Sequence, residues 1–575
     1  MLDFRNANSL WASVLVETLV RLGLRNAVVC PGSRSTPLAL ALALYPEIVA
    51  TPVLDERSAS FFALGLAKAS RLPVAVVCTS GSAGANFYPA VIEARESRVP
   101  LLMLTADRPP ELRDCASGQT IDQQKLFGDF PNGYSELALP EVQIGQLHYL
   151  RQTLVQAWTR SCHPVPGPVH LNCPFRDPLP PIADGQTEAL EAIARELDSS
   201  DFFAHLGDLQ FSAPKVQLSI EPSAKGLIIA GPAQPADPEG YCRAIAHLSQ
   251  SLGWPVLAEG LSPLRNYGTI NPQLIANYDG ILRNREAAAR LTPDQVIQIG
   301  PLPTSKVLRQ WLGQVNPNRW IIDPGDRNLD ALHGRSVPVK CSIEHLSIQC
   351  KPKPNWPNPY TQLWLTLDAR FRQRISEVFQ TDAPIESKLT WLLSQHLPSK
   401  TPLIIANSMP VRDVEYFWQP GDRHILPYFN RGANGIDGTL STALGIAQHH
   451  GRGVLLTGDL ALLHDTNGFL MRPKFQGHLT ILLVNNSGGG IFEMLPVSKF
   501  EPPFEDFFAM PQAIAFADLC QTYGVDYALI KNWDQLIAWL NPLPLNGIRL
   551  LELQTNRKTD ARWRQDTLNA IARDL

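Results

Sequence analysis

The stretch that decides the fold runs from Gly458 to Gly490 and reads GDLALLHDTNGFLMRPKFQGHLTILLVNNSGGG. The apolar run 454–456 comes just before it and the apolar run 479–484 lies inside it, and each predicts a buried strand. Small and polar residues follow both runs, GD after the first and NNSG after the second. Because ligands bind at the carboxyl ends of strands in an open parallel sheet, we expect Asp459 and Asn486 to meet at one edge.

These residues also offer a consistent set of metal ligands. The carboxylate of Asp459, the amide oxygen of Asn486 and the backbone carbonyl of Gly488 are hard oxygen donors. Such donors suit Mg²⁺, which usually keeps part of its octahedron for water and for phosphate oxygens. The alternative is that Asp459 is an ordinary turn residue and Asn486 caps a loop, because short motifs also match by chance.

Length and composition set the broad class. A chain of 575 residues is too long for one core and suggests three or four domains, and 45% hydrophobic with 18% charged residues is typical of a soluble globular protein. A net charge of −4 without a basic tract argues against a nucleic-acid partner. No apolar run is long enough to span a membrane. Nine scattered cysteines without a CxxC pair predict free thiols and a cytoplasmic location.

Strand patterns alternate with helix patterns along the whole chain, which predicts an α/β protein with doubly wound parallel sheets. The helices are expected at 8–23, 37–44, 59–69 and 360–378. The strands are expected at 27–30, 74–78, 99–105, 226–230, 255–258, 296–299, 320–322, 403–405, 454–456, 479–484 and 550–553. A turn of small residues is expected at 79–84, a boundary near 176–200 and a proline-rich linker at 351–359.

The GD…NN pattern resembles the signature of thiamin-diphosphate enzymes, and three α/β units in this order resemble the decarboxylase-like members of that family. The resemblance covers essentially the whole chain. It implies a pyrimidine-binding domain at 1–185, a central domain at 200–350 and a diphosphate-binding domain at 358–575. It also implies that Asp459, Asn486 and Gly488 hold Mg²⁺ or Mn²⁺ on the cofactor's diphosphate. Leu460 departs from the pattern, since many relatives have glycine there.

Glu56 lies where the family has a glutamate that hydrogen-bonds the aminopyrimidine ring of thiamin diphosphate, so the resemblance implies a catalytic role for it. The alternative is that Asp55 and Glu56 are carboxylates favoured by the dipole at the start of a helix. The metal motif, which follows in the expected order, favours the catalytic role. In relatives the two halves of the site come from different chains, which implies a homodimer or a homotetramer.

Four arginines follow predicted strands or lie in glycine-rich turns, namely Arg34, Arg108, Arg412 and Arg431. The planar guanidinium pairs with carboxylates through two hydrogen bonds. Any one of these residues would more commonly form a surface ion pair. The coincidence of four near one cofactor indicates substrates that carry several carboxylates.

The segments CPGSRSTPL, TADRPPEL, NRGANGIDG and NNSGGGIFEMLP resemble one branch of the family. Its members decarboxylate 2-oxoglutarate and add the remaining fragment to isochorismate in menaquinone and phylloquinone biosynthesis, and both substrates are dicarboxylates. The resemblance implies substrate contacts by Ser33, Arg34, Arg108, Gln119, Lys306, Arg412 and Arg431. It implies cofactor contacts by Glu56, Ser408, Gly435, Ile436, Gly458, Asp459, Leu460, Asn486, Ile491, Phe492 and Leu495.

Several of these apolar residues have a simpler alternative. Ile436 would keep the cofactor bent, and Ile491, Phe492 and Leu495 would cover its thiazolium ring, but such residues are by default part of a core. The segment 500–508, rich in Phe, Pro and acidic residues, is a candidate mobile lid.

Three other functions remain open from the sequence. The chain could be another thiamin-dependent 2-oxo-acid decarboxylase or carboligase, an inactive relative that serves as a binding subunit, or a plain nucleotide-binding protein. The presence of Glu56, Asp459 and Asn486 argues against the inactive relative. A nucleotide-binding protein would explain the fold but not the ordered match of distant motifs.

Overall fold

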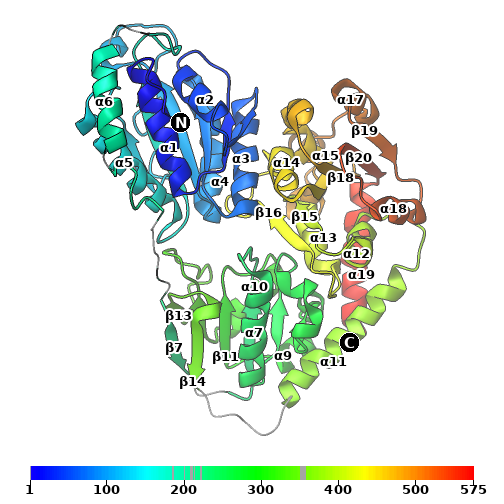
Figure 1. Ribbon diagram of the computed structural model, residues 1–575. Coiled ribbons are helices and arrows are strands. Elements are labelled where there is room, and N and C mark those ends of the chain that lie inside the picture. Colours follow the sequence, from blue (N-terminus) through cyan, green and yellow to red (C-terminus); the bar gives the residue numbers. More distant parts are fainter. Residues whose placement is uncertain are drawn as a thin grey trace. The chain divides into compact units, whose positions relative to one another are not determined.

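The computed structural model describes residues 2–575 apart from 184, 186, 200, 208–211, 213, 221–222 and 350–357. Three six-stranded sheets form its framework, and each recorded strand pair within them is parallel (Figure 1). A two-stranded sheet, β14-β7, accompanies them. This architecture confirms the predicted α/β fold class. Among the described residues, no helix combines the length and the apolar character needed to cross a membrane.

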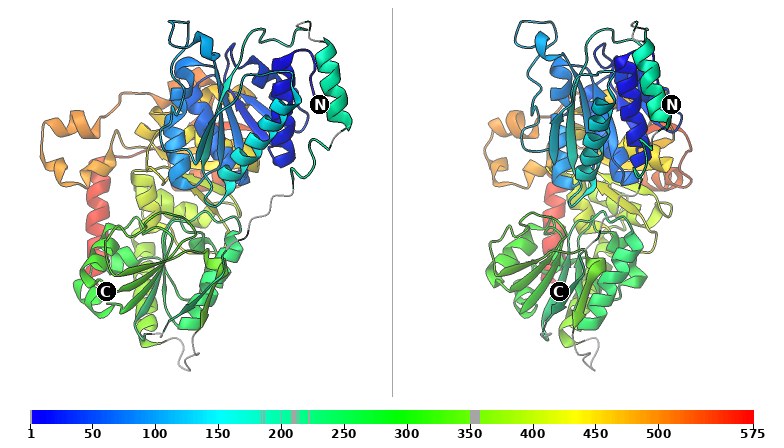
Figure 2. Two further views of the ribbon diagram at one scale, coloured as in Figure 1. Left: turned by 90° about the vertical axis from the view of Figure 1, so that its left-hand side faces the viewer. Right: turned by 60° about the vertical axis from the view of Figure 1, so that its left-hand side comes forward.

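The first sheet has the strand order β2-β1-β3-β4-β6-β5. Helices α1, α2, α5 and α6 cover one face, and α3 and α4 the other (Figures 1 and 2). The strands are β1 (Asn26–Val29), β2 (Val49–Pro52), β3 (Val74–Cys78), β4 (Leu101–Asp107), β5 (Gly133–Glu136) and β6 (Pro168–Pro174). The helices are α1 (Ala7–Leu22), α2 (Thr36–Ala43), α3 (Glu56–Ser70), α4 (Tyr88–Ser97), α5 (Ile144–Cys162) and α6 (Thr187–Ser199).

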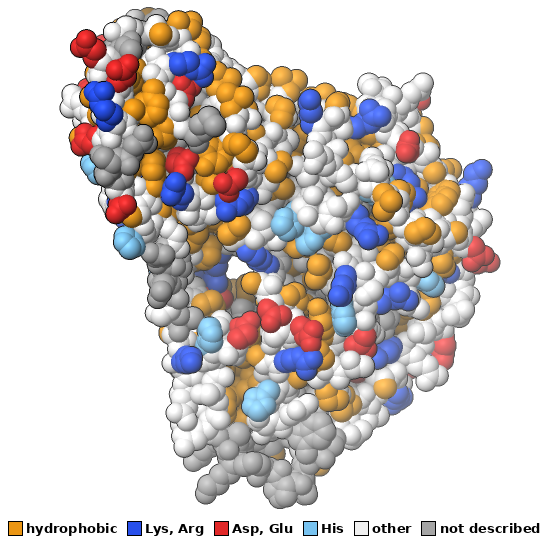
Figure 3. Space-filling model, viewed as in Figure 1, with side chains coloured by type: hydrophobic (Ala, Val, Ile, Leu, Met, Phe, Trp, Pro, Cys, Tyr) orange, Lys and Arg blue, Asp and Glu red, His pale blue; other side chains and the backbone are white. Residues whose placement is uncertain are grey.

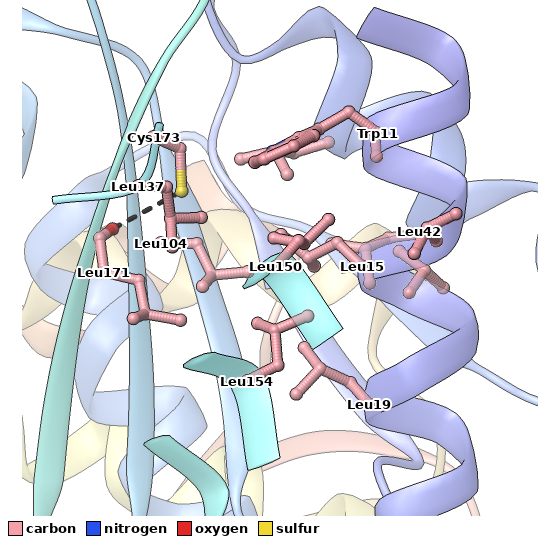
Figure 4. Close-up of a cluster of buried hydrophobic side chains, with 14 of the residues drawn as sticks. Trp11, Leu15, Leu19, Leu42, Leu104, Leu137, Leu150, Leu154, Leu171 and Cys173 are labelled. Atoms are coloured by element: carbon pink, nitrogen blue, oxygen red, sulfur yellow. Dashed lines mark hydrogen bonds between the residues drawn. The ribbon is translucent and has the colours of Figure 1, made fainter. Parts of the chain in front are cut away.

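The helical period of α1 places apolar residues on the face that packs into the hydrophobic core beside the first sheet. Trp11, Leu15 and Leu19 lie one turn apart, and they pack against Leu150 and Leu154 of α5 (Figure 4). Local signals set both ends of the helix. The side chain of Asn6 accepts a hydrogen bond from the backbone N–H of Ser9 at 2.8 Å, and Gly23 ends the helix with φ +119°.

The second sheet has the order β10-β9-β8-β11-β12-β13, with α7 on one face and α10 on the other. Its strands are β8 (Gly226–Ala230), β9 (Val256–Ala258), β10 (Leu274–Ile275), β11 (Gln295–Ile299), β12 (Asn318–Ile322) and β13 (Ser336–Val339). The accompanying strands are β7 (Val216–Ser219) and β14 (Leu346–Gln349). The helices are α7 (Pro238–Leu252), α8 (Tyr278–Ile281), α9 (Arg285–Arg290) and α10 (Lys306–Val315).

The third sheet has the order β16-β15-β17-β18-β20-β19. Its strands are β15 (Pro402–Ile405), β16 (Leu426–Phe429), β17 (Arg452–Gly458), β18 (His478–Asn485), β19 (Asp526–Leu529) and β20 (Gly547–Gln554). The helices in this stretch of the chain are α11 (Pro359–Val378), α12 (Glu386–His396), α13 (Met409–Phe417), α14 (Thr439–His450), α15 (Asp459–Leu463), α16 (Gly490–Glu493), α17 (Phe516–Tyr523), α18 (Trp533–Leu540) and α19 (Arg557–Arg573).

The chain divides into two compact units, which we name unit 1 and unit 2. Unit 1 comprises Met1–Phe211, Asn430–Arg452 and His464–His478, and unit 2 comprises Ser212–Phe429, Gly453–Leu463 and Leu479–Leu575. In unit 1, α14 crosses α3 at two glycines, where a Cβ on Gly65 would lie 2.3 Å from the carbonyl oxygen of Thr442. The three predicted domain ranges stay a prediction.

Two sequence expectations differ in detail from the structure. The segment expected to be a turn at 79–84 continues into a 3₁₀ helix, η1 (Gly81–Phe87), since its small residues allow the tighter winding. Of the proline-rich linker, 351–357 lies outside the described residues, and Asn358 and Pro359 instead cap and begin α11. Acidic and basic side chains are interspersed over the face seen in Figure 3, in keeping with the small net charge.

Candidate functional site

The Asp459 loop and the Asn486 loop meet at the carboxyl ends of adjacent strands. β17 ends at Gly458 and β18 at Asn485, and the two strands are neighbours in the third sheet. The backbone N–H of Gly488 donates to one carboxylate oxygen of Asp459 at 2.7 Å, and the N–H of Leu460 donates to the other at 2.8 Å. The two loops are therefore joined through the side chain of Asp459.

The donors at this point fit a cation. The Oδ1 atom of Asn486 is buried and has no hydrogen-bond partner in the described part of the chain, while its Nδ2 donates to Glu386 at 2.9 Å. Burial raises the pKa of the Asp459 carboxyl to about 6. A buried acceptor without a donor and a desolvated carboxylate are both costly, and a bound cation would relieve both. One carboxylate with amide and carbonyl oxygens suits Mg²⁺ or Mn²⁺.

The backbone beyond Asn486 is held in a conformation that requires glycine. Gly488 has φ +123°, and a Cβ there would lie 2.2 Å from the carbonyl oxygen of Ala509. That carbonyl accepts a hydrogen bond from the N–H of Gly489 at 2.7 Å. On the other side, the guanidinium of Arg557 donates to the carbonyl of Ser487 at 2.7 Å. The loop is thus fixed by contacts from both flanks.

The predicted apolar cover lies directly after this loop. Ile491 and Phe492 belong to the short helix α16, Leu495 follows it, and all three are half-buried. The ring of Phe492 meets that of Phe508 edge to face, with the centroids 5.8 Å apart. The candidate lid contains a π-helix, Glu505–Ala509, in which Phe507 is 75% exposed.

Three predicted substrate or cofactor residues of unit 2 lie at helix starts. Ser408 precedes α13 and has φ +72°, an uncommon conformation for a residue with a side chain. Arg412, one turn later, donates to the carbonyl of Ser408 at 2.5 Å, and burial lowers the pKa of its guanidinium. Lys306 is the first residue of α10 and is exposed. The structure therefore brings Ser408 and Arg412 together.

Glu56, in unit 1, is the first residue of α3. Asp55 caps that helix by accepting a hydrogen bond from the N–H of Ser58 at 3.1 Å. Because Asp55 caps the helix, the half-buried carboxylate of Glu56 is available for another contact. The two interpretations of this pair are thus compatible, since Asp55 stabilises the start of the helix and Glu56 can still have a catalytic role.

Two predicted substrate residues of unit 1, Arg108 and Gln119, meet at Ser80. The backbone carbonyl of Ser80 accepts from the side-chain amide of Gln119 at 3.1 Å, and its hydroxyl accepts from Arg108. Arg34 is buried and donates to the carbonyl of Phe175 at 2.9 Å. Burial, and next to it the charge of Arg108, lowers the pKa of Arg34. The nearest recorded carboxylate to Arg34 is that of Asp177, at 3.9 Å. Ser33, which precedes Arg34, is exposed.

The loop that carries Arg431, Gly435 and Ile436 is anchored by a buried carboxylate that sequence reasoning missed. Glu93 accepts hydrogen bonds from the N–H groups of Gly432 and Ala433, at 3.1 and 2.7 Å. Lys68 lies 3.5 Å from the same carboxylate, and both side chains are at most 4% exposed. No local pattern reveals Glu93, because a glutamate on an amphipathic helix is normally a surface residue.

Sequence reasoning also missed a buried ionic cluster in unit 2. Arg564 forms ion pairs with Glu386 and Asp413, and Glu386 contacts Asn486. The available signal was the spacing of Arg557, Asp560 and Arg564, which places three charged residues on one face of α19. All three are buried.

The predicted site residues divide between the units. Unit 1 contains Ser33, Arg34, Glu56, Arg108, Gln119, Arg431, Gly435 and Ile436. Unit 2 contains Lys306, Ser408, Arg412, Gly458, Asp459, Leu460, Asn486, Gly488, Ile491, Phe492 and Leu495.

Comparison with protein families gives two matches. The model described as "Thiamine pyrophosphate enzyme, N-terminal TPP binding domain" matches residues 11–126. The model described as "Middle domain of thiamine pyrophosphate" matches residues 206–405. Both matches agree with the cofactor that the sequence predicts.

Relatives match the chain from end to end. A 2-succinyl-5-enolpyruvyl-6-hydroxy-3-cyclohexene-1-carboxylate synthase of Trichormus variabilis is 60% identical, over 99% of each chain. Proteins of the same name from Nostoc sp. and Gloeothece citriformis are 60% and 58% identical, also over 99% of each chain.

Among solved structures, benzoylformate decarboxylase from Polynucleobacter necessarius aligns with a TM-score of 0.65, over 97% of this chain and 99% of its own. The 4-hydroxybenzoylformate decarboxylase of Rhodococcus jostii aligns with a TM-score of 0.68, over 95% and 99%. Each is 15% identical to this chain, so the likeness is one of fold.

Proposed function

Because the chain belongs to the family of 2-succinyl-5-enolpyruvyl-6-hydroxy-3-cyclohexene-1-carboxylate synthases, within the thiamine pyrophosphate enzymes, we propose that it makes the product for which that family is named. In this reaction 2-oxoglutarate loses CO₂ and the remaining fragment is added to isochorismate, as a step of menaquinone or phylloquinone biosynthesis. The observation that carries the proposal is 60% identity over 99% of both chains. The polar groups described above support it.

The metal centre is part of the proposal. Asp459, Asn486 and the carbonyl of Gly488 would hold Mg²⁺ or Mn²⁺ against the diphosphate of the cofactor. The orphaned Oδ1 of Asn486 and the raised pKa of Asp459 support this set of ligands. Thiamin diphosphate, when bound, supplies the electron sink that decarboxylation of a 2-oxo acid requires.

The chain's own residues position the reactants and control protons. Glu56 would hold a proton against a ring nitrogen of the aminopyrimidine and so favour the tautomer needed for proton removal. Ile491, Phe492 and Leu495 would keep water from the reacting carbon. Ile436 would support the cofactor in a bent conformation. Gly435, Gly458 and Leu460 would contribute backbone and apolar contacts to the same cofactor.

Two polar groups are proposed to bind the dicarboxylate substrates. One comprises Arg34, Arg108 and Gln119, with Ser33 beside them; the proximity of the two guanidinium groups supports an anion there. The other comprises Ser408 and Arg412, whose guanidinium is desolvated and would gain from a carboxylate partner. Arg431 and Lys306 are proposed as further contacts. We also propose an active homodimer or homotetramer in the cytoplasm, following the family pattern.

The test is detection of the product by mass spectrometry. Purified protein is incubated with 2-oxoglutarate, isochorismate, thiamin diphosphate and Mg²⁺, beside a Glu56→Gln variant. We expect the cyclohexene product from the native protein and a loss of several orders of magnitude in the variant. Release of CO₂ without use of isochorismate would refute the acceptor substrate. An unreactive protein that still binds the cofactor would refute the whole assignment.

A further inference from the structure

We propose that Glu386 is a positioning residue that sets the orientation of the Asn486 amide, so that its oxygen and not its nitrogen faces the metal. This inference rests on the proposed metal site and extends it to residues that do not themselves touch the metal. It concerns a buried cluster of Glu386, Asp413 and Arg564, which we name the amide clamp.

The contact is direct and buried. Glu386 is the first residue of α12, and Asn486 follows β18, 100 residues later in the chain. Both residues are buried, at 2% and 6% exposure. The Nδ2 of Asn486 donates to Oε2 of Glu386 at 2.9 Å, and Oδ1 of the same amide is left without a partner among the described residues. The contact thus uses the nitrogen and leaves the oxygen available.

A carboxylate imposes this orientation for a simple reason. The two ends of an amide have nearly the same shape, but one is a donor and the other an acceptor. An ionised carboxylate only accepts hydrogen bonds, so it pairs with the NH₂ group and repels the oxygen. A glutamine at position 386 could instead donate to Oδ1, and both orientations of the Asn486 amide would then be satisfied. The negative charge of Glu386 is therefore what selects one orientation of the Asn486 amide.

The clamp is itself rigidly held. Arg564 is fully buried and pairs with Asp413 through two bonds, from Nε at 2.7 Å and from Nη2 at 3.0 Å. Its Nη2 also bonds Glu386. Ser387 adds a bond from its hydroxyl to Asp413 at 2.9 Å. The carboxylate of Glu386 thus has one side on Arg564 and the other on Asn486.

The charge of the surroundings supports a cation nearby. Glu386, Asp413 and Asp459 are buried carboxylates, and each is at most 4% exposed. Arg564 supplies one buried positive charge to this group. Carboxylates in excess of their buried partners favour the binding of a divalent cation.

The experiment measures Mn²⁺ binding to the full chain by electron paramagnetic resonance, at saturating thiamin diphosphate. Residues that orient metal ligands typically change metal affinity by about 10- to 100-fold when they are replaced. We expect Glu386→Gln to raise the Kd for Mn²⁺ by about that factor. The matched control is Glu377→Gln on α11, where the glutamate is half exposed and pairs with Arg374 at 2.8 Å. It should leave the Kd unchanged.

A double-mutant cycle separates positioning from a general charge effect. If Glu386 acts through the amide, Glu386→Gln should have little further effect on the Kd once Asn486→Ala has removed that amide. If its charge alone matters, the two effects should add. Glu386→Asp gives a second variant that keeps the negative charge of the side chain but withdraws the carboxylate from Asn486 by one methylene group. It should also weaken Mn²⁺ binding, and a native Kd in this variant would overturn the inference.

The outcomes distinguish the inference from the function on which it rests. Unchanged Mn²⁺ binding in Asn486→Ala would overturn the metal site and the inference together. Weaker binding in Asn486→Ala with native binding in Glu386→Gln would overturn only the role of Glu386. Formation of the product by the native chain is measured separately, so a wrong substrate assignment would show there and not in the Kd.

Discussion

Replacing Glu93 by glutamine removes a buried negative charge in unit 1. That charge pairs with a lysine and also accepts hydrogen bonds from the backbone of a loop. The carboxylate faces Lys68 at 3.5 Å, and it accepts the N–H groups of Gly432 and Ala433 at 3.1 and 2.7 Å. The loop that contains these two residues also carries the proposed site residues Arg431, Gly435 and Ile436. Glu93→Gln should therefore lower stability and loosen this loop at the same time.

The magnitude follows from burial. The side chains of Lys68 and Glu93 are 1% and 4% exposed, and breaking a buried pair by removing one partner costs about 3–5 kcal/mol. Burial already lowers the pKa of Lys68, so the lysine can lose its proton in the variant. The loss of folding free energy should therefore be about 3 kcal/mol, the lower end of this range. Glutamine can still accept from one of the two N–H groups. Loss of the other hydrogen bond to a charged group is worth about 1.5–3 kcal/mol.

Hydrogen–deuterium exchange with mass spectrometry is the suitable assay, because a chain of this length need not unfold in one step. A free-energy change of about 1.5–3 kcal/mol corresponds to exchange about 10- to 150-fold faster in the peptide that contains residues 430–437. In Lys68→Met/Glu93→Gln the uncompensated charge is gone. This double variant should recover thermal stability but not the protection of the loop.

Native exchange of the 430–437 peptide in Glu93→Gln would refute the reasoning, whatever the thermal stability. Equal destabilisation by Glu93→Gln and by the exposed control Glu377→Gln would refute the claim that the pair is buried and coupled.

Three further predictions concern other parts of the chain. Burial lowers the pKa of His170 to about 3, so the folded state keeps it neutral while the unfolded state binds a proton below about pH 6.5. Stability should fall as the pH falls through this range, by about 2 kcal/mol between pH 7 and 5, and urea titrations should show this loss shrinking in His170→Gln. Gly488→Ala, with its φ of +123° and a Cβ 2.2 Å from a carbonyl, should cost about 1–3 kcal/mol and weaken Mn²⁺ binding, whereas Gly313→Ala, with open space around it, should do neither. Arg412→Lys loses the guanidinium fork and one charge-assisted hydrogen bond, so steady-state kinetics should show KM for 2-oxoglutarate rising about 10- to 100-fold; an unchanged KM would remove Arg412 from the substrate site.

The sequence located the central strands well and the edge strands poorly. β3 and β8 were predicted to the residue, because an interior strand of a parallel sheet is buried on both faces and reads as an apolar run. The strands β5, β10, β13, β16 and β19 were missed, and each lies at the edge of its sheet. Of these, β5, β13 and β19 contain polar or exposed residues, which an edge strand tolerates. β6 is interior but was missed because His170 and Asn172 interrupt its apolar pattern.

The sequence by itself determined the fold class and the residues at the ends of the strands. A strand pattern fixes where its carboxyl end lies, and parallel strands bring such ends to a common edge, so Asp459 and Asn486 were accessible to local reasoning. The tertiary structure alone decided which charged residues on helices are buried. In the sequence, Glu93, Glu386 and Arg564 resemble surface residues, and their partners are distant along the chain. Glu386 and Arg564, for example, are separated by 178 positions. Only packing removes such charges from water, and only then must each be paired, which is what makes them anchors of the loops around the site.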